Sequence, residues 1–156
     1  MLSHQIYAYL DQARVPYQRI EATSPYSPSP AGHSSPGHSG LISKTVVLEI
    51  DNQLALLVFP ANHRVDLKEL CRSIRCYSIT LPNDARITSS IHDYQRDTIT
   101  PLGNLYGLDV YLAESLSQQP DITFRAGDQN ELVRMPYDQF AKLVEPIIVR
   151  YGCLAP

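Results

Sequence analysis

The sequence predicts an α+β fold in a single domain, with a curved mixed β-sheet or barrel of about six or seven strands flanked by helices. Two apolar runs separated by Asp51-Asn52 are typical of a buried β-hairpin. Apolar residues at helical spacing near both ends of the chain predict amphipathic helices. A length of 156 residues fits one domain over 1–156 that is large enough to bury its own core.

Local signals place the elements of the first half of the chain. Ser3 can cap a helix that has Ile6, Tyr7 and Leu10 on one face. Asp66-Leu67-Lys68-Glu69 resembles a capping box, which predicts the start of a second helix. The expected order is a helix from Ser3 to about Arg14, a strand at Tyr17–Ile20, a Pro/Ser/Gly-rich loop over 23–40, strands at Thr45–Ile50 and Gln53–Phe59, and a helix from Asp66 to about Arg75.

The second half of the chain predicts further short strands and a final helix. The strands are expected at Tyr77–Leu81, Leu108–Leu112, Ile122–Ala126 and Glu131–Met135. Pro136 is expected to start the helix, because proline is favoured at the first helical position. Its apolar stripe would consist of Tyr137, Phe140, Leu143, Val144 and Ile147, with a kink or restart at Pro146.

Composition narrows the classes of function. A net charge of −3 argues against a broad basic face that coats nucleic acid, although a few residues could still hold one RNA end. The five histidines are scattered and the three cysteines form no C-x-x-C, so we expect neither a metal site nor a disulfide framework. Free cysteines and the lack of a signal-like or membrane-spanning apolar run favour a cytoplasmic protein.

Cations at two places are candidates for binding an anionic ligand. Lys44 lies where the loop over 23–40 enters the hairpin, and could bind a phosphate or polarise a carbonyl there. The alternative is a solvated lysine at a strand end. Lys68, Arg72 and Arg75 share one face of the predicted helix, and Arg64 extends the row. This stripe could meet RNA phosphates, or it could simply be a solvated helix face.

The segment Thr100–Leu112 combines a rigid turn with the start of a strand. Pro101 fixes φ, while Gly103 and Gly107 permit backbone angles and close approaches that a Cβ would block. Such a turn could hold a small polar ligand through its peptide groups. An ordinary loop leading into a strand explains the same residues.

A serine hydrolase is not favoured. The segments 32–36 and 37–41 resemble the G-x-S-x-G nucleophile elbow, but both lack the final glycine and neither follows a convincing strand. The carboxylates are dispersed, and no pair of them is placed as an acid/base couple. An unrelated small-molecule hydrolase remains the last of the functional alternatives.

Several of these segments, in this order, resemble the YbaK/ProX-type aminoacyl-tRNA deacylases, which are themselves similar to the editing domain of bacterial prolyl-tRNA synthetases. The similarity covers roughly residues 3 to 150 and includes an N-terminal helix followed by the strand Val15–Ile20. The other matching segments are Tyr26-Ser27, Lys44–Val47, Leu57–Leu67, Pro101–Gly107 and Phe124–Gly127.

The resemblance implies hydrolysis of the ester bond of mischarged aminoacyl-tRNA, in trans and without a cofactor or metal. It implies that Lys44 positions the terminal phosphate or the ester, and that backbone groups near Pro101, Leu102 and Gly103 hold the aminoacyl group. Water, aided by a ribose hydroxyl of the substrate, would then attack the ester carbonyl. Further substrate-binding candidates are Tyr26, Ser27, Asp97, Gly127 and Gln129, and the tRNA backbone would contact Arg64, Lys68, Arg72 and Arg75.

The sequence also departs from the family pattern at positions that bear on catalysis. Asp97 stands where many members have glycine, Ala22 where many have histidine, and Gln129 where many have histidine or another polar group. A weak helix former, Ser27–Gly32, replaces the usual Thr-initiated helix. These departures favour a second hypothesis, a catalytically degenerate module that binds tRNA or a small ligand. The expected partner is the acceptor end of aminoacyl-tRNA, with an aminoacyl-tRNA synthetase as a further candidate and no membrane.

Overall fold

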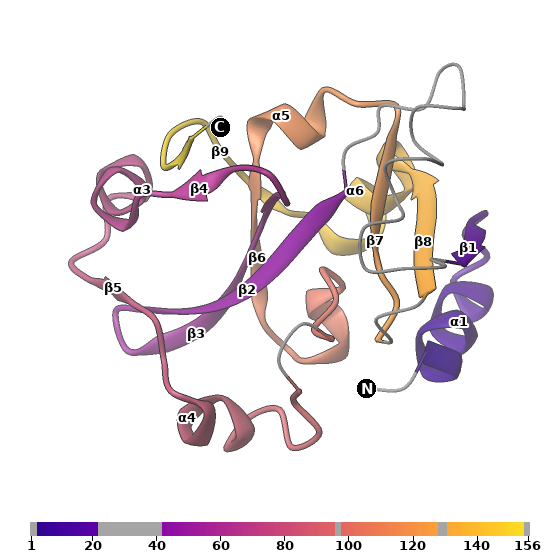
Figure 1. The fold of residues 1–156 in the computed structure, drawn as a ribbon, viewed down its shortest axis with the longest axis horizontal. Coiled ribbons are helices and arrows are strands. Elements are labelled where there is room, and N and C mark those ends of the chain that lie inside the picture. Colours follow the sequence, from indigo (N-terminus) through magenta and orange to yellow (C-terminus); the bar gives the residue numbers. More distant parts are fainter. Residues whose placement is uncertain (1–2, 22–41, 96–97, 128–130, 155–156) are drawn as a thin grey trace.

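The computed structural model describes residues 3–21, 42–95, 98–127 and 131–154, and all statements on structure concern these residues (Figure 1). The loop over 23–40 that the sequence predicts lies outside them. The helices are α1 (Ser3–Gln12), α3 (Leu67–Ile74), α4 (Asp84–Thr88), α5 (Glu114–Ser117) and α6 (Tyr137–Val144), with a 3₁₀ turn, η1, at Gly103–Leu105. The strands are β1 (Gln18–Glu21), β2 (Ser43–Ile50), β3 (Gln53–Pro60), β4 (Arg64–Val65), β5 (Ile79–Thr80), β6 (Asp109–Ala113), β7 (Asp121–Arg125), β8 (Glu131–Pro136), β9 (Ile147–Val149) and β10 (Cys153–Leu154).

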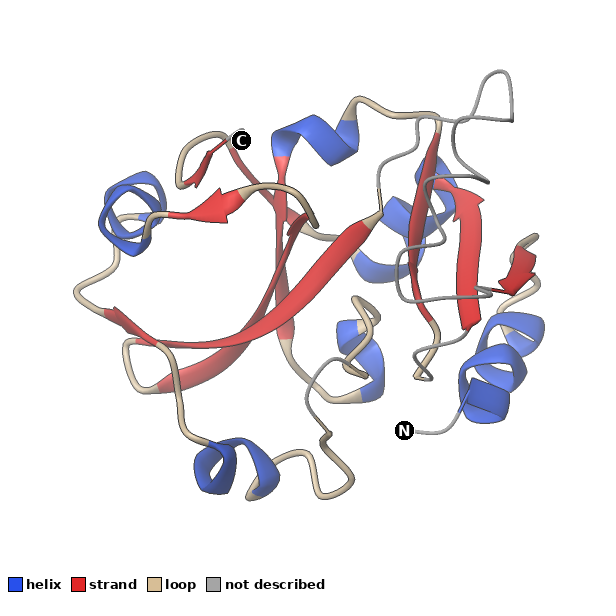
Figure 2. Ribbon diagram, in the orientation of Figure 1, coloured by secondary structure: helices blue, strands red, loops and turns tan. Residues whose placement is uncertain are grey.

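The strands form a mixed five-stranded sheet, an antiparallel three-stranded sheet and a small two-stranded pair (Figure 2). The five-stranded sheet has the order β5-β2-β3-β6-β9, in which β3 and β6 are parallel and β6 and β9 are parallel. The three-stranded sheet has the order β1-β8-β7. The α+β class is therefore confirmed, but the described residues form ten strands rather than six or seven, and the sheets do not close into a barrel.

The predicted hairpin is confirmed at its turn and in its pairing. Asp51 and Asn52 both have positive φ, 49° and 71°, which is the conformation of a two-residue turn that matches the twist of the paired strands. Lys44 pairs with Phe59 and Val47 with Leu56. Ser43 Oγ donates a 2.8 Å hydrogen bond to the carbonyl of Thr123 on β7, which joins the start of β2 to the three-stranded sheet.

The five-stranded sheet separates two hydrophobic clusters, because successive side chains of a strand point to opposite faces. The inner core lies between the two larger sheets and includes Leu56, Val58, Leu112, Phe124 and Val133. The α3-side core lies on the other face of the five-stranded sheet and includes Leu48, Leu57, Phe59, Leu70 and Ala113. Burial of β3 on both faces, as its continuous hydrophobicity predicts, follows from this arrangement.

Helix α3 begins and ends where local chemistry predicts. The carboxylate of Asp66 accepts hydrogen bonds from the backbone N–H groups of Lys68 and Glu69, at 3.0 and 3.2 Å. Arg75 ends the helix in the left-handed conformation, with φ 58° and ψ 43°. Leu70 is fully buried in the α3-side core, and Leu67 and Ile74 pack against it.

The prediction of where the last helix ends is wrong. Helix α6 stops at Val144, because Glu145 adopts a left-handed conformation (φ 54°) and Pro146 has no N–H to continue the hydrogen-bond ladder. Ile147 therefore belongs to strand β9 and is 45% exposed instead of completing the helical stripe. The strand predicted at Tyr77–Leu81 is reduced to Ile79–Thr80.

Candidate functional site: an arginine-lined groove

A surface groove lies between α3 and the segment that follows β9. Its volume is about 430 Å³, and its lining residues are Glu69, Arg72, Ser73, Arg75, Ile148, Arg150 and Tyr151. We call it the α3 groove. Three arginines face one glutamate in this lining, so the groove is locally positive in a protein whose net charge is −3. Such a surface attracts an anionic ligand.

The arginines of the α3 groove are held only by weak surface contacts. Arg72 forms an ion pair of 3.0 Å with Glu69, and Arg150 forms one of 3.0 Å with Glu114. The two arginine side chains are 78% and 74% exposed, so water screens both pairs strongly. Arg75 is exposed, and its guanidinium has no hydrogen-bond or ion-pair partner among the described residues. A phosphate can therefore bind these guanidinium groups at little cost.

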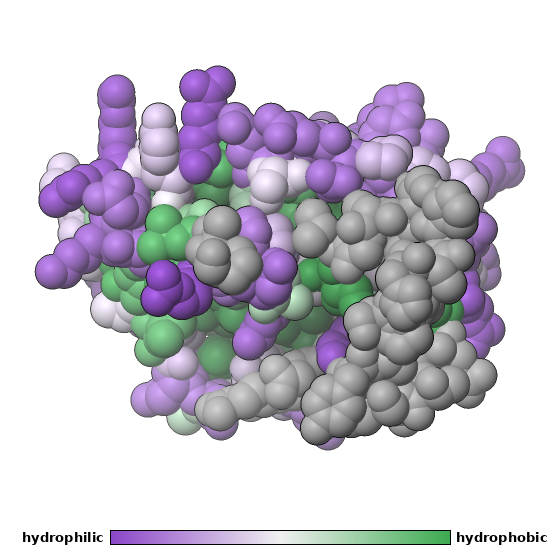
Figure 3. Space-filling view, turned by 45° about the horizontal axis from the view of Figure 1, so that its top comes forward, coloured by the Kyte–Doolittle hydropathy of each residue, from purple (hydrophilic) through white to green (hydrophobic). Residues whose placement is uncertain are grey.

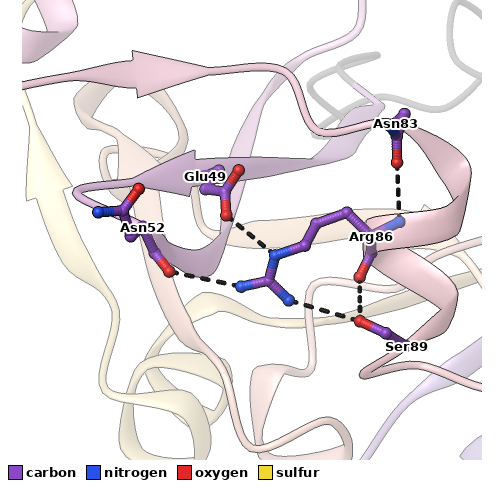
Figure 4. Close-up of polar contacts among 5 residues, drawn as sticks. All are labelled: Glu49, Asn52, Asn83, Arg86 and Ser89. Carbon is purple, nitrogen blue, oxygen red and sulfur yellow. Dashed lines mark hydrogen bonds and ion pairs between the residues drawn. The ribbon is translucent and has the colours of Figure 1, made fainter.

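A contrasting arginine, Arg86, is tied into the fold (Figure 4). Its Nε donates to the carboxylate of Glu49 at 2.9 Å, and its other two nitrogens approach the carbonyl of Asn52 and the hydroxyl of Ser89 at 3.4 and 3.5 Å. Its backbone N–H donates to the Asn83 side chain, which caps α4. Arg86 thus joins α4 to the hairpin and has a structural role.

The predicted cationic stripe is only partly brought together. Arg72 and Arg75 line the α3 groove, although Arg75 lies one residue beyond the end of the helix. Lys68 and Arg64 are exposed on α3 and β4 but do not line the groove. Sequence reasoning missed Arg150 and Tyr151, because contacts between distant segments place them opposite α3: β9 pairs with β6, and the N–H of Asp66 donates to the carbonyl of Gly152 at 2.7 Å.

Because Lys44 and the turn at Pro101–Gly103 both flank strand ends, the sequence predicts that they face each other across a cleft, but Lys44 does not face this turn. It is exposed on β2 and pairs with Phe59, so its side chain points to the face of the sheet that carries the α3-side core. Leu102 is buried in the inner core, on the opposite face. The structure therefore places Lys44 on the same face of the sheet as α3. Its ammonium group has no partner in the described part of the chain.

The backbone N–H groups of the turn at Pro101–Gly103 form hydrogen bonds within the turn itself. The N–H groups of Thr100, Leu102 and Gly103 donate to the hydroxyl of Tyr106, the hydroxyl of Thr100 and the carbonyl of Pro101, respectively. A Cβ at residue 103 would lie 2.5 Å from Cγ2 of Val110 and would overlap the carbonyl oxygen of Leu108. The absence of a Cβ at Gly103 thus allows the turn to pack closely against strand β6 of the same chain.

A polar cluster at the other end of the molecule joins α1 to the three-stranded sheet. The hydroxyl of Tyr7 donates a 2.7 Å hydrogen bond to Glu131, and the guanidinium of Arg19 lies 4.2 Å from the centre of the Tyr7 ring. Burial, and then the hydrogen bond to Glu131, raise the pKa of Tyr7 to about 12, so its hydroxyl stays a donor. Sequence reasoning missed this cluster, because Tyr7 and Glu131 are 124 residues apart.

Two buried polar atoms, Nδ1 of His63 and Oγ of Ser115, have no hydrogen-bond partner within the described ranges. They follow the carboxyl ends of the parallel strands β3 and β6. No group of three or more metal-ligating side chains occurs among the described residues, and none of the helices there is long and apolar enough to span a bilayer.

The other predicted site residues are placed as follows. Gly127 is half-buried, lies two residues beyond the end of β7 and has a positive φ of 75°. Tyr26, Ser27, Asp97, Gln129 and the departure at Ala22 lie outside the described residues. Figure 3 shows hydrophobic surface (green) between hydrophilic side chains (purple) on one face of the molecule.

Comparison with known proteins identifies the family. The family model of the aminoacyl-tRNA editing domain matches residues 35–143, which is 109 of the 156 residues. The chain belongs to the aminoacyl-tRNA editing domain family. The resemblance to deacylases that the sequence suggests is therefore confirmed at the level of the family. No curated protein was found to match the sequence.

Solved structures share the fold of this chain at low sequence identity. A candidate trans-editing enzyme for prolyl tRNA synthetase has a TM-score of 0.74 and 16% identity, and the match covers 96% of this chain and 97% of that one. A scaffold from a study of computational epitope grafting has a TM-score of 0.75 and 15% identity, with 96% of both chains covered. A signal-transduction candidate from Marinobacter aquaeolei VT8 has a TM-score of 0.73 and 14% identity, and the match covers 99% of this chain but 31% of that one.

Proposed function

We propose that this editing domain hydrolyses the ester bond of mischarged aminoacyl-tRNA in trans, and that the α3 groove binds the tRNA backbone. Family membership supports the choice of substrate. The observation that carries the binding mode is the groove itself, where Arg72 and Arg75 at the end of α3 meet Arg150 just after β9. Guanidinium groups bind phosphate oxygens in a bidentate manner, which suits them to an RNA backbone.

The groove also offers a surface for an unpaired base. The ring of Tyr151 lies at the groove and is 63% exposed, and Ile148 provides an apolar contact beside it. Aromatic side chains stack on bases of any sequence, and each stacked base contributes about 1–3 kcal/mol to binding. A single-stranded RNA end bound here would thus be held by its phosphates and by one base.

The chemistry assigned to Lys44 is electrostatic. Water adds to the ester carbonyl carbon, negative charge develops on the carbonyl oxygen, and the bond to the ribose oxygen then breaks as that oxygen takes up a proton. An ammonium group near the terminal phosphate or the carbonyl oxygen would stabilise this charge. Lys44 supports the proposal because it is exposed, has no partner in the described part of the chain and lies on the face of the sheet that carries α3.

The second candidate function, tRNA binding without hydrolysis, is favoured by a specific observation. The N–H groups of Thr100, Leu102 and Gly103 are all used within their own turn, so they are not free to hold an aminoacyl group. Asp97, which precedes this turn, lies outside the described residues. If its side chain narrows the site, Asp97→Gly should raise deacylation of at least one mischarged tRNA.

A panel of mischarged tRNAs, assayed with wild type and Lys44→Ala, separates the two candidates. We expect wild type to release the amino acid from at least one member and Lys44→Ala to lose about tenfold or more of that rate. Thermal stability should change by no more than about 0.5 kcal/mol, as for other surface substitutions. Lys142→Ala, at another exposed lysine, is the matched control and should keep the wild-type rate.

If wild type and Asp97→Gly both leave every tRNA of the panel intact, the deacylase proposal fails and the binding module takes its place. Normal turnover by Lys44→Ala would remove the role assigned to Lys44. A cytoplasmic location and an aminoacyl-tRNA synthetase partner remain predictions from the sequence.

A further inference from the structure

Two cysteines meet at the carboxyl end of α3. The sulfur atoms of Cys71 and Cys76 lie 2.8 Å apart, and both side chains are only partly buried. A disulfide bond requires a sulfur–sulfur distance of about 2.05 Å, so bond formation needs a further approach of less than an ångström. Both residues are free thiols in the structure.

The geometry of the helix end produces this contact. The left-handed conformation of Arg75 reverses the chain after the last turn of α3. The N–H of Cys76 then donates to the carbonyl of Cys71 at 3.2 Å, and the thiol of Cys71 approaches the carbonyl of Cys76 at 3.1 Å. The two side chains are therefore held against each other by the backbone. The spacing is not that of a C-x-x-C motif, which is why the sequence alone does not predict a pair.

We propose that Cys71 and Cys76 form a reversible intramolecular disulfide when the protein meets a low-molecular-weight disulfide. The thiolate of one cysteine attacks the external disulfide, releases one thiol and forms a mixed disulfide. The sulfur of the other cysteine, after losing its proton, attacks the protein sulfur of that mixed disulfide, and the second external thiol leaves. The two protein thiols are thereby oxidised by two electrons, and the external disulfide is reduced to two thiols.

The contact between the two thiols favours the second step of the reaction. Burial, and then the contact with Cys71, raise the pKa of Cys76. Once either cysteine carries the mixed disulfide, the other is already adjacent and reacts at a high effective concentration. The third cysteine, Cys153, lies on β10 in contact with the α3-side core and takes no part in the pair.

The disulfide would close a ring of residues that includes part of the lining of the α3 groove. Arg72, Ser73 and Arg75 line the groove and lie between the two cysteines in the sequence. A disulfide that joins Cys71 to Cys76 would fix the backbone that presents these side chains. The formation of the bond does not depend on RNA binding, so its test stands apart from that of the proposed function.

Mass spectrometry of the full chain in a glutathione redox buffer tests the proposal. After oxidation, wild type and Cys153→Ser should each lose the mass of two hydrogen atoms, and a digest should contain one linked peptide that joins residues 71 and 76. Dithiothreitol should reverse the change. Oxidation should also raise Tm by about 5 °C, because the closed ring restricts the unfolded chain.

Single variants provide the control. Cys71→Ser and Cys76→Ser should each gain glutathione instead of losing hydrogen, and their Tm should not rise on oxidation. Two glutathione adducts on wild type, a link that includes Cys153, or fully reduced cysteines after equilibration in oxidised glutathione would overturn the proposal.

Discussion

The turn at Pro101–Gly103 and the α3 groove use their polar groups in opposite ways. In the turn, the N–H groups of Leu102 and Gly103 donate within the turn, and both residues are buried. In the groove, the guanidinium groups of Arg72 and Arg150 are mostly exposed, and that of Arg75 has no partner in the described part of the chain. The turn is therefore built to hold strand β6, whereas the groove is open to a ligand.

This contrast shows why glycine and proline are ambiguous signals of a binding loop. Both a ligand and a neighbouring strand can require a glycine at the point of closest approach. At Gly103 the neighbouring atoms belong to Leu108 and Val110 of the same chain. Arg72 on α3, Arg75 just after α3 and Arg150 just after β9 form a less specific pattern in the sequence, yet the structure brings them to one groove.

Gly103→Ala should have the largest effect on stability. The new Cβ would overlap the carbonyl of Leu108 and lie 2.5 Å from Val110, so the turn would have to move away from β6. Overpacking of this kind costs about 1–3 kcal/mol, and we expect the upper end because one of the clashing atoms is backbone. Denaturant unfolding measures the change.

Gly107→Ala is the matched control for Gly103→Ala. No atom lies within 4 Å of a Cβ at residue 107, but φ is +69°, so only backbone strain is added. We expect a loss of about 1 kcal/mol. An equal loss of stability in the two variants would contradict the proposal that the close contact with β6 is what requires glycine at residue 103.

Arg75→Ala combined with Arg150→Ala should weaken the binding of uncharged tRNA by about tenfold or more. Two lost phosphate contacts should also reduce the slope of log K against log salt by about 1.5. Fluorescence titrations at several salt concentrations measure both quantities. The effect should be similar for different tRNAs, because phosphate contacts carry no base specificity.

Arg14→Ala is a close control for Arg75→Ala. Arg14 is also exposed and also follows a helix in the left-handed conformation, with φ 57° against 58° for Arg75. It lies at the end of α1, away from the groove. If Arg14→Ala reduces the salt slope as much as Arg75→Ala does, binding is non-specific and the groove has no special role.

Arg86→Ala should have a small effect, similar to that of Gly107→Ala, and on stability rather than on binding. The loss of the ion pair with Glu49 and of the contact with Asn52 should cost about 1 kcal/mol, since the side chain is partly exposed. The affinity for tRNA should not change. Reduced affinity in this variant would contradict the distinction between the structural arginine and the groove arginines.

Local signals predicted the parts of the fold that local chemistry determines. The Asp51-Asn52 turn and the Asp66 cap follow from backbone preferences and hydrogen bonds between near neighbours, and both are confirmed. The short helix at Glu114–Ser117 was missed, because four residues give too little periodicity. Strand β9 was missed because the spacing of Ile147 matches the apolar stripe of the preceding helix. That helix ends before Pro146, so Ile147 begins a strand instead.

The candidate site was less predictable, because it depends on contacts between distant segments. Arg72 and Arg75 could be proposed from helical spacing, but Arg150 joins them through long-range contacts, among them the parallel pairing of β9 with β6. The position of Lys44 was expected from its place at a strand end, whereas its face depends on the register with Phe59. A shift of that register by one residue would point it to the opposite face.

Hydrogen–deuterium exchange with and without uncharged tRNA compares the two regions in one measurement. We predict that tRNA slows exchange in peptides that cover residues 67–76 and 147–152, and leaves peptides that cover 98–107 unchanged. The N–H groups of Thr100, Leu102 and Gly103 are already hydrogen-bonded within their turn and gain no new partner. Protection confined to residues 98–107, with no change at α3 and β9, would contradict the assignment of the RNA-binding surface to the α3 groove.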